Sequence, residues 1–385
     1  MIYKEDIQKT LAAYDTSKIT IASLGGHSAL DVCEGAKKLG FRTLVIARKG
    51  REKTYSKYYK TRGAKGCATS FANERGCVDE VIVVNDFSDL INSKVQEKLL
   101  RINTILIHSR YFWVYFDFEK VENELKVPIY GTREMLKLEE RDVEKNQYYL
   151  LQKAGIRIPK LYASPAEIDG MVIVKVNEAA RGYERAFFYA SSPKDFEKKS
   201  QELLKAGTIT KEALDKAVIE EFILGAQVNF NYFYSNLTDE LELMGTDTRR
   251  QTSLDGYLRL PADEQLEVLK IKKPKLIETG HMTCTTKESL LEKAFDIGQK
   301  FVDMSKHEVP PGIIGPFALQ GAVAAEDGNE EIVIFDVSMR IPGSPGTRFT
   351  PYTSYLHGRP VSYGERIAME IKLAIEEGKL NEVCT

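Results

Sequence analysis

The stretch Ser23-Leu-Gly-Gly-His-Ser-Ala-Leu30 joins an apolar run to a helical pattern and contains residues suited to binding an anion. Glycines let the backbone approach an anion closely, and a helix N-terminus favours a phosphate. His27 can donate a hydrogen bond, and Ser28 stands where it could cap the helix. The stretch therefore predicts a phosphate site that includes His27 and Ser28. The alternative is a simple tight turn followed by a serine cap.

Small, hydroxyl or basic residues also follow three other strands that we expect in the first third of the chain. These groups are Arg48-Lys49, His108-Ser109-Arg110 and Gly131-Thr132-Arg133. Ligands of an open parallel sheet bind beyond the carboxyl ends of its strands. We therefore expect the groups, including His108 and Ser109, to converge on one anion pocket.

The first turn does not match the glycine fingerprint of a dinucleotide-binding site. A fingerprint that began at Gly25 would need glycine where His27 and Leu30 stand. The second strand ends in Arg48-Lys49 instead of the acidic residue that binds a ribose diol. A phosphate monoester therefore suits the pocket better than NAD.

A second group of residues suits a nucleoside triphosphate. Val172–Lys175 places Lys175 at the end of a strand, from which a lysine can reach phosphates. The segment Ile219–Gly225 resembles a linker strand whose backbone could pair with an adenine edge. The alternative for both segments is a surface hairpin with ordinary charged residues.

A third group suits a metal ion and a polyphosphate. Asp336, Ser338 and Arg340 alternate along a predicted strand, so they share one face. A carboxylate, a small oxygen ligand and an arginine together suit Mg²⁺ and phosphate oxygens. The alternative is a polar strand face that is exposed to solvent.

The pattern of the chain indicates the elements that would position these residues. In the first third, short β-branched runs alternate with helical segments, which predicts a doubly wound parallel sheet. The expected strands are 19–23, 43–47, 80–84, 104–108 and 127–130, with helices at 29–39 and 90–101. Residues 63–76 read as a loop, because they are rich in glycine, alanine and serine.

The pattern changes near Gly131, and the rest of the chain mixes strands with helices in an α+β manner. A charged helical segment at 133–153 precedes strand-like runs at 171–176, 186–190, 217–222 and 228–234. Helices are expected at 194–206 and 363–377. We predict an N-terminal domain at 1–130 and two α+β subdomains at 131–225 and 226–385.

The composition excludes several classes of protein. The chain has 385 residues, 43% of them hydrophobic, and a formal net charge of -2, which argues against nucleic acid and anionic membranes as partners. No apolar run could span a bilayer, and the N-terminus does not resemble a signal peptide. Five scattered cysteines predict free thiols and a cytoplasmic location, with a loop disulfide between Cys67 and Cys77 as the alternative.

Taken together, these features resemble the ATP-grasp superfamily, and most closely its archaeal formate-dependent ligases of 5-aminoimidazole-4-carboxamide ribonucleotide (AICAR). The resemblance covers nearly the whole chain. It is carried by segments such as SLGGHSAL, VIVK, IEEFILG, GTDTRRQTSLDGYLRLPADEQLE, PPGIIGPFALQ, FDVSMR and GRPVSYGERIAMEIK. It implies a pre-ATP-grasp N-terminal domain followed by an ATP-grasp domain.

The resemblance also implies a reaction in which ATP, formate and AICAR give the formylated ribotide FAICAR, ADP and phosphate. Formate would attack the γ-phosphate to form formyl phosphate, and the 5-amino group of AICAR would then attack the acyl carbon. Phosphorylation turns an oxygen of formate into a leaving group, so catalysis rests on positioning and charge neutralisation. Mg²⁺ or Mn²⁺ would assist, and the family suggests a homo-oligomer.

Matched residue by residue, the resemblance assigns roles to the positions of this chain. His27, Ser28, His108 and Ser109 would bind AICAR. Asp247, Arg249, Arg250 and Arg340 would face the acyl phosphate. ATP would be held by Lys145, Lys175, Glu220, Phe222, Ile223 and Gln227, and the metal by Gln320 and Asp336.

The chain departs from the family pattern at several positions. The lid after Lys175, residues 177–188, keeps one glycine where the family has several. The segments at 108–110 and 132–134 and the carboxylate Asp336 also differ. Two alternatives follow: a related ligase that joins another carboxylate to another amine, and a nucleotide-binding protein that does no chemistry.

Overall fold

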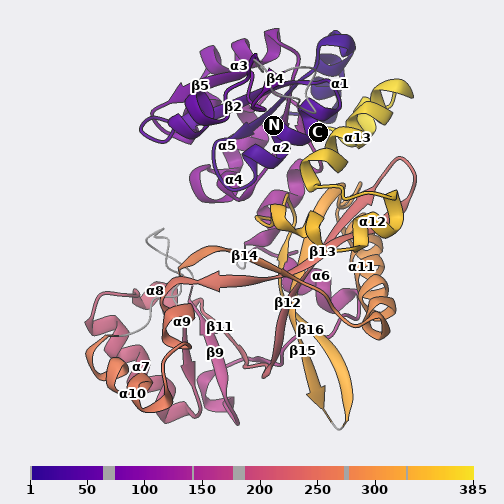
Figure 1. Ribbon diagram of the computed structural model, residues 1–385. Helices are drawn as coiled ribbons and strands as arrows, with labels where there is room; N and C mark the ends of the chain where they lie inside the picture. The colour runs from indigo at the N-terminus through magenta and orange to yellow at the C-terminus, as the bar shows by residue number, and fades with distance from the viewer. Residues whose placement is uncertain (1, 64–73, 141–142, 177–186, 273–276, 327) are drawn as a thin grey trace.

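The computed structural model describes residues 2–63, 74–140, 143–176, 187–272, 277–326 and 328–385. Three larger sheets organise these stretches (Figure 1). The N-terminal layer lies at the top of the view, and the two antiparallel sheets lie below it. Most of the predicted lid, residues 177–186, lies outside the described residues, as does Cys67.

The N-terminal sheet confirms the predicted parallel, doubly wound arrangement. Its order is β5-β2-β1-β6-β7, and every paired strand is parallel. Ile21 packs into one core and Ala22 into another, so helices cover both faces of the sheet. The strands are β1 (Thr20–Leu24), β2 (Arg42–Arg48), β5 (Glu80–Val84), β6 (Thr104–Ile107) and β7 (Ile129–Tyr130).

Helices before and between these strands cover the sheet. They are α1 (Lys4–Ala12), α2 (Ala29–Lys38), α3 (Ser93–Arg101), α4 (Arg110–Tyr115) and α5 (Phe118–Glu124). The loop expected at 63–76 begins and ends in a small ladder of β3 (Arg62–Gly63) with β4 (Glu74–Arg75). Strand β7 is shorter than predicted, because only Ile129 and Tyr130 pair with β6.

The last long helix, α13 (Tyr363–Glu376), returns to the N-terminal layer, where it lies beside α2 (Figure 1). The two helices cross at Gly35 and Gly364. A Cβ atom on either glycine would lie 2.0 Å from backbone atoms of the other helix. The short helix α14 (Leu380–Val383) follows, and Thr385 N donates to Ile129 O at 2.8 Å. The C-terminal residues therefore complete the core of the N-terminal layer.

The second sheet is antiparallel, with the order β10-β9-β11-β8. It confirms the strands and the helix predicted in this region. The elements are β8 (Leu161–Tyr162), β9 (Val172–Lys175), β10 (Phe187–Ala190), α7 (Pro193–Lys205), α8 (Lys211–Asp215) and β11 (Val218–Glu221). Val174, Phe188 and Phe196 belong to its own small core.

The third sheet is also antiparallel, with the order β14-β13-β12-β15-β16. Its strands are β12 (Gly225–Ser235), β13 (Glu240–Gln251), β14 (Glu278–Cys284), β15 (Gly315–Glu326) and β16 (Asn329–Ser338). Phe230 of β12 packs with the helices α6 (Gln147–Lys153) and α11 (Glu288–Glu308). Its neighbours Asn229 and Asn231 point to the opposite face, where the candidate site lies.

Short helices lie between or after the strands of the third sheet. They are α9 (Thr252–Tyr257), α10 (Ala262–Ile271) and α12 (Tyr352–His357), with a 3₁₀ segment at Arg133–Glu139 before α6. Cys33, Cys77, Cys284 and Cys384 are free thiols. Among the described residues, no helix combines the length and the apolar character that crossing a membrane requires.

Candidate active site

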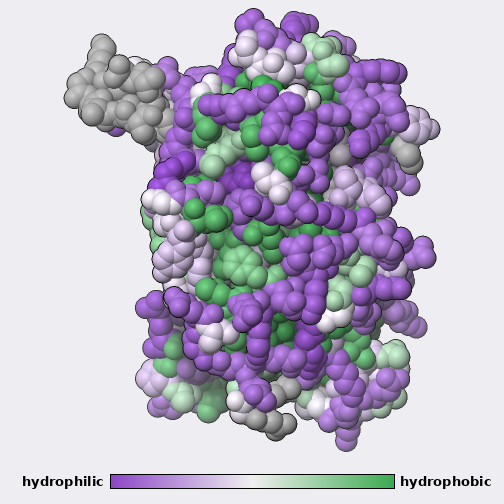
Figure 2. Space-filling view, turned by 90° about the vertical axis from the view of Figure 1, so that its right-hand side faces the viewer, coloured by the Kyte–Doolittle hydropathy of each residue, from purple (hydrophilic) through white to green (hydrophobic). Residues whose placement is uncertain are grey.

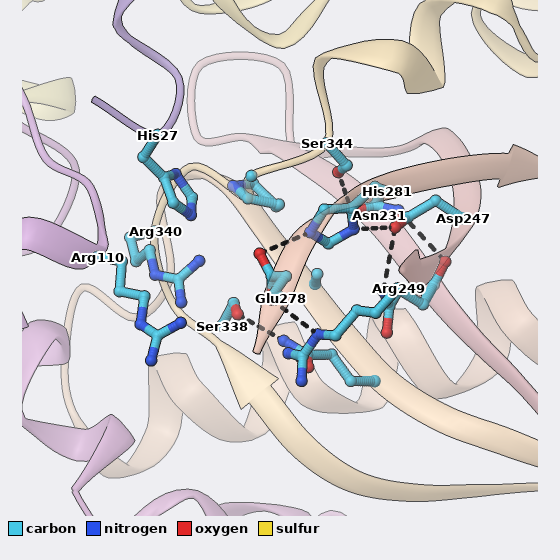
Figure 3. A pocket seen from close by; sticks show the side chains of 15 residues that line it. His27, Arg110, Asn231, Asp247, Arg249, Glu278, His281, Ser338, Arg340 and Ser344 are labelled. Carbon is cyan, nitrogen blue, oxygen red and sulfur yellow. Dashed lines mark hydrogen bonds and ion pairs between the residues drawn. The ribbon is translucent and has the colours of Figure 1, made fainter. Parts of the chain in front are cut away.

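A polar pocket lies where the loops of the N-terminal sheet meet the open face of the third sheet (Figure 3). Its walls come from the loop after β1, the start of α4, all five strands of the third sheet, and the segment after β16. The polar lining residues are His27, Arg110, Asn229, Asn231, Asp247, Arg249, Glu278, His281, Gln320, Ser338, Arg340 and Ser344. Segments distant in sequence therefore form one site.

His27 and Ser28 connect the first loop to the segment that follows β16. His27 adopts a left-handed conformation with φ 48°, and its Nδ1 lies 3.1 Å from Ser28 Oγ. Ser28 stands at the N-cap position of α2 but makes no side-chain cap, because its hydroxyl donates to Pro342 O at 2.8 Å. Burial and the charges of Arg340 and Arg110 lower the pKa of His27 to about 3. His27 is therefore a neutral hydrogen-bonding group at neutral pH.

His108 and Ser109 lie beside the pocket but do not line it. His108 is buried, with Nε2 3.2 Å from Met339 O, and burial lowers the pKa of this histidine to about 4. Ser109 Oγ accepts a hydrogen bond from Tyr111 N at the start of α4. The next residue, Arg110, does line the pocket. These two predicted residues thus support the loop that presents Arg110.

The predicted convergence of four strand ends is only partly correct. Arg48, after β2, pairs with Asp86 at 3.5 Å. Arg133, after β7, is buried and donates to the backbone carbonyls of Val121, Leu125 and Thr385. Arg133 therefore holds the protein's own backbone, and only the loops after β1 and β6 contribute side chains to the pocket lining.

Asp247 is the buried centre of a hydrogen-bonded group on the third sheet. Its carboxylate accepts from Asn231 Nδ2 at 2.6 Å and from Asn229 Nδ2 at 3.1 Å, and it pairs with His281 Nδ1. His281 Nε2 lies 3.1 Å from Glu278 Oε1. Burial opposes the charged imidazole, but the bonds to Asp247 and Glu278 raise the pKa of His281 to about 9.

His281 and Glu278 are pocket residues that sequence reasoning missed. Both belong to β14, which was not predicted as a strand. The register that pairs Arg249 with His281 places them on the pocket face. In the sequence, the only sign of this part of the pocket was the histidine itself, and the segment around His281 matches no motif.

Arg249 and Arg250 diverge because side chains alternate along a strand. Arg249 Nε lies 3.4 Å from Glu278 Oε2, and its Nη2 donates to Gln320 Oε1. Arg250 is on the other face of β13 and pairs with Asp255 at 3.4 Å. Of the two arginines, only Arg249 lines the pocket.

Gln320 and Asp336 are directly opposite each other in the β15–β16 register. Gln320 Nε2 donates to Ser338 Oγ at 2.7 Å, and Asp336 Oδ2 lies 4.0 Å from Arg249 Nη2. The described residues contain no group of three or more His, Cys, Asp or Glu placed to hold a metal. Mg²⁺ commonly binds one or two carboxylates and completes its shell with phosphates and water, so Asp336 fits it, with Gln320 Oε1, which accepts from Arg249 Nη2, as a neighbouring oxygen.

Arg340 extends the same face beyond the end of β16. Its Nε lies 3.5 Å from Glu139 Oε1, and Glu139 also accepts from Met339 N at 2.6 Å. Glu139 belongs to the segment that links the N-terminal layer to α6. This carboxylate therefore fixes both the backbone before Arg340 and the direction of its guanidinium.

Lys175 lies between the second and third sheets. Its Nζ pairs with Glu220 and donates to Phe335 O at 3.0 Å and to Tyr148 Oη at 3.3 Å. Tyr148 in turn donates to Glu220 Oε2 at 3.2 Å. The predicted lysine and glutamate are thus brought together, and Tyr148 joins them without having been predicted.

The other predicted ATP residues are more dispersed. Phe222 and Ile223 follow β11, and Phe222 N donates to Met171 O at 2.9 Å. Gln227 is exposed on the β12 face that carries Asn229. Lys145 pairs with Glu308 at 3.1 Å and does not line the pocket.

Comparisons with known proteins agree with this arrangement. Residues 21–162 match the family model "Protein of unknown function (DUF1246)", and residues 195–385 match "Domain of unknown function (DUF1297)". The chain is 39% identical to the 5-formaminoimidazole-4-carboxamide-1-(beta)-D-ribofuranosyl 5'-monophosphate synthetase of Methanocaldococcus jannaschii, over 100% of this chain and 99% of that protein. The synthetase of the same name from Methanothermobacter thermautotrophicus is 38% identical with the same coverage.

The chain belongs to this synthetase family.

Solved structures give the same result for the fold. The IMP biosynthesis protein PurP from Thermococcus kodakaraensis is similar with a TM-score of 0.67 and 27% identity, over 95% of this chain and 100% of that one. An ADP complex of purK, N5-carboxyaminoimidazole ribonucleotide synthetase, is similar with a TM-score of 0.55 and 13% identity. The match covers 90% of this chain and 78% of that one. The fold of this synthetase-family chain is the ATP-grasp fold.

Proposed function

We propose that the chain converts AICAR to FAICAR, with formate as the carbon source and ATP as the energy source. The pocket carries this proposal, because it brings the loops of the N-terminal sheet within reach of the strand face next to Lys175. Relatives named as synthetases of the formylated ribotide support the same reaction. The protein is accordingly an ATP-dependent ligase of purine biosynthesis.

The reaction takes place in two steps. A formate oxygen attacks the γ-phosphorus, the bond from that phosphorus to the β–γ bridging oxygen breaks, and ADP leaves. The 5-amino nitrogen of AICAR then attacks the formyl carbon, the bond from that carbon to the phosphate oxygen breaks, and phosphate leaves as the amine loses a proton. Since both steps move negative charge, fixed cations can stabilise both transition states.

Arg249 and Lys175 supply fixed positive charge on the ATP side of the site. Arg249 lies between Glu278 and Gln320, where it can contact the acyl phosphate. Lys175 reaches from β9 to the backbone of β16, where the β- and γ-phosphates would lie. Gln320 and Asp336 would hold Mg²⁺ or Mn²⁺, and the ion would neutralise phosphate charge when bound.

The remaining assignments concern the two ligands. Glu220, Phe222 and Ile223 would flank the adenine, and Gln227 would face the ribose of ATP. On the AICAR side, His27 is a neutral donor or acceptor beside Ser28. His108 and Ser109 act through the loop that they hold, because neither lines the pocket.

The test is a phosphate-release assay with ATP, Mg²⁺, formate and AICAR. We expect release only when all four are present, and FAICAR as the second product. ADP formation with another carboxylate and amine, but not with AICAR, would indicate a related ligase. Calorimetric binding of ATP or AICAR without ADP formation would indicate a nucleotide-binding protein that does no chemistry.

We also propose a homo-oligomer located in the cytoplasm, where ATP and ribotides are available. Phe349, Tyr355 and Leu356, in or beside α12, are each more than 60% exposed. Figure 2 shows hydrophobic residues gathered at mid-height of one face, between more polar surfaces above and below. Exposed apolar patches commonly mark protein interfaces. Light scattering after size-exclusion chromatography will give the molar mass, and a monomer would contradict the proposal.

A further inference from the structure

Two arginines from different parts of the molecule meet in the pocket. Arg110 begins α4 in the N-terminal layer, and Arg340 follows β16 of the third sheet. Figure 3 shows their guanidinium groups side by side below His27, on the side of the pocket opposite Arg249. Both charges act on His27, since each lowers the pKa of that imidazole. The two arginines therefore border the same space.

The charges of the lining residues show what this space would attract. Arg110, Arg249, Arg340 and the protonated His281 contribute four positive charges, and Asp247 and Glu278 contribute two negative charges. His281 pairs with both carboxylates, and Arg249 pairs with Glu278. The lining residues thus carry two more positive than negative charges, and the carboxylate that pairs with Arg340, Glu139 at 3.5 Å, lies outside the lining. A phosphate monoester carries nearly two negative charges at neutral pH.

The hydrogen-bonding chemistry of the space also suits a phosphate. A guanidinium presents a planar fork that binds two phosphate oxygens at once. Glu139 does not line the pocket. It lies behind Arg340, with its Oε1 3.5 Å from Arg340 Nε, so it leaves the other side of the guanidinium toward the pocket. His27 adds a neutral hydrogen-bonding group, and Gly343 leaves room for it, because a Cβ there would lie 2.6 Å from His27 Nε2.

We propose that Arg110 and Arg340 form a clamp that binds a phosphate dianion between the N-terminal layer and the third sheet. The phosphate belongs either to the 5′ position of the ribotide or to the group transferred from ATP. The proposal rests on the proposed function only for the identity of the ribotide. It makes Arg110, the basic residue of the predicted group at 108–110, a binding residue of the reaction in place of His108 and Ser109.

The experiment compares the wild type with Arg110→Gln, with Arg110→Lys as the charge-conserving variant. Arg101→Gln is the matched control, because Arg101 is an exposed arginine at the end of α3 in the same layer. Calorimetry measures the Kd of AICAR, of its nucleoside without the phosphate, and of inorganic phosphate in the presence of MgADP. Thermal melting confirms that each variant is folded.

We expect Arg110→Gln to weaken one phosphate-bearing ligand about 10- to 100-fold, the range for a lost charged hydrogen bond. Arg110→Lys should recover part of this loss, and Arg101→Gln should bind like the wild type. Loss for AICAR but not for its nucleoside assigns the clamp to the 5′-phosphate. Loss for inorganic phosphate with AICAR unchanged assigns it to the transferred group.

The clamp is wrong if a folded Arg110→Gln variant binds AICAR and inorganic phosphate as the wild type does. It is also wrong if AICAR and its nucleoside lose affinity equally, because the phosphate would then not be the group contacted. A failure of the proposed function looks different. The wild type would then form no FAICAR, while the loss of phosphate-dependent binding in Arg110→Gln would remain.

Discussion

Replacing His281 with asparagine tests whether the pocket holds an imidazolium that is charged at neutral pH. The variant keeps a polar side chain of similar reach but cannot carry a positive charge. It leaves Asp247 bound to Asn229 and Asn231, so the carboxylate retains two hydrogen-bond donors. The change should therefore remove mainly the ion pairs of His281 with Asp247 and Glu278.

The magnitude follows from the pKa of His281, about 9 in the folded protein against an ordinary value of 6.5. Each pH unit between the two values corresponds to about 1.36 kcal/mol, so the charge stabilises the fold by about 3 kcal/mol. A raised pKa gives stability that is fully present below the unfolded pKa and disappears as pH rises through the folded pKa. The contribution should therefore be about 3 kcal/mol at pH 5.5 and be mostly lost by pH 9.

The assay is urea unfolding of the wild type and His281→Asn at pH values between 5.5 and 9.5. The lower limit avoids Glu278, whose pKa lies well below its usual range because His281 and Arg249 outweigh the effect of burial. His307→Asn is the control, because the His307 side chain is 79% exposed. A difference between wild type and His281→Asn that stays constant from pH 6.5 to 9.5 would refute the charged imidazolium.

Three further substitutions test other parts of the structure. Gly343→Ala should disturb His27, since the new Cβ would lie 2.6 Å from its Nε2, and should raise the KM for AICAR several-fold more than the KM for ATP. Lys175→Met should raise the KM for ATP about 10- to 100-fold without changing AICAR binding measured by calorimetry; an unchanged KM would remove Lys175 from the ATP site. Gly364→Ala should lower the free energy of unfolding by about 1–3 kcal/mol or more, because its Cβ would meet Asp31 O at 2.0 Å; a melting temperature equal to that of wild type would contradict this helix crossing.

Much of the fold could be predicted from local patterns. The strand β5 has the predicted bounds, α2 ends one residue earlier than predicted, and α7 is shifted by one residue at both ends, because apolar periodicity and capping residues mark such elements directly. The strand β14 was missed. It is an edge strand with mostly exposed or half-exposed residues, so it lacks the apolar alternation that identifies strands.

The candidate site was predictable where a motif carried the chemistry. His27, Lys175 and Arg340 were predicted from their places at strand ends and on a strand face, and Asp247 and Arg249 from the resemblance to a known family. The alternation that separates Arg249 from Arg250 is a property of any strand, but which face meets the pocket depends on the neighbouring strands. His281, Tyr148 and Glu139 carried no motif, and only their contacts show what they do.

The sequence by itself determined the parallel N-terminal sheet, many of the later strands and helices, and the types of residue available for binding anions and ATP. These properties depend on residues that are near one another in the sequence, so local periodicity and side-chain chemistry are enough to predict them. Only the tertiary structure decided that Arg133 binds backbone carbonyls while Arg110 faces the pocket. It also decided that α13 returns to pack on α2. The physical reason is that the burial of a side chain and its bonding partners depend on segments that are distant in sequence. A single segment therefore cannot reveal whether its charged side chain will contact a ligand or the protein itself.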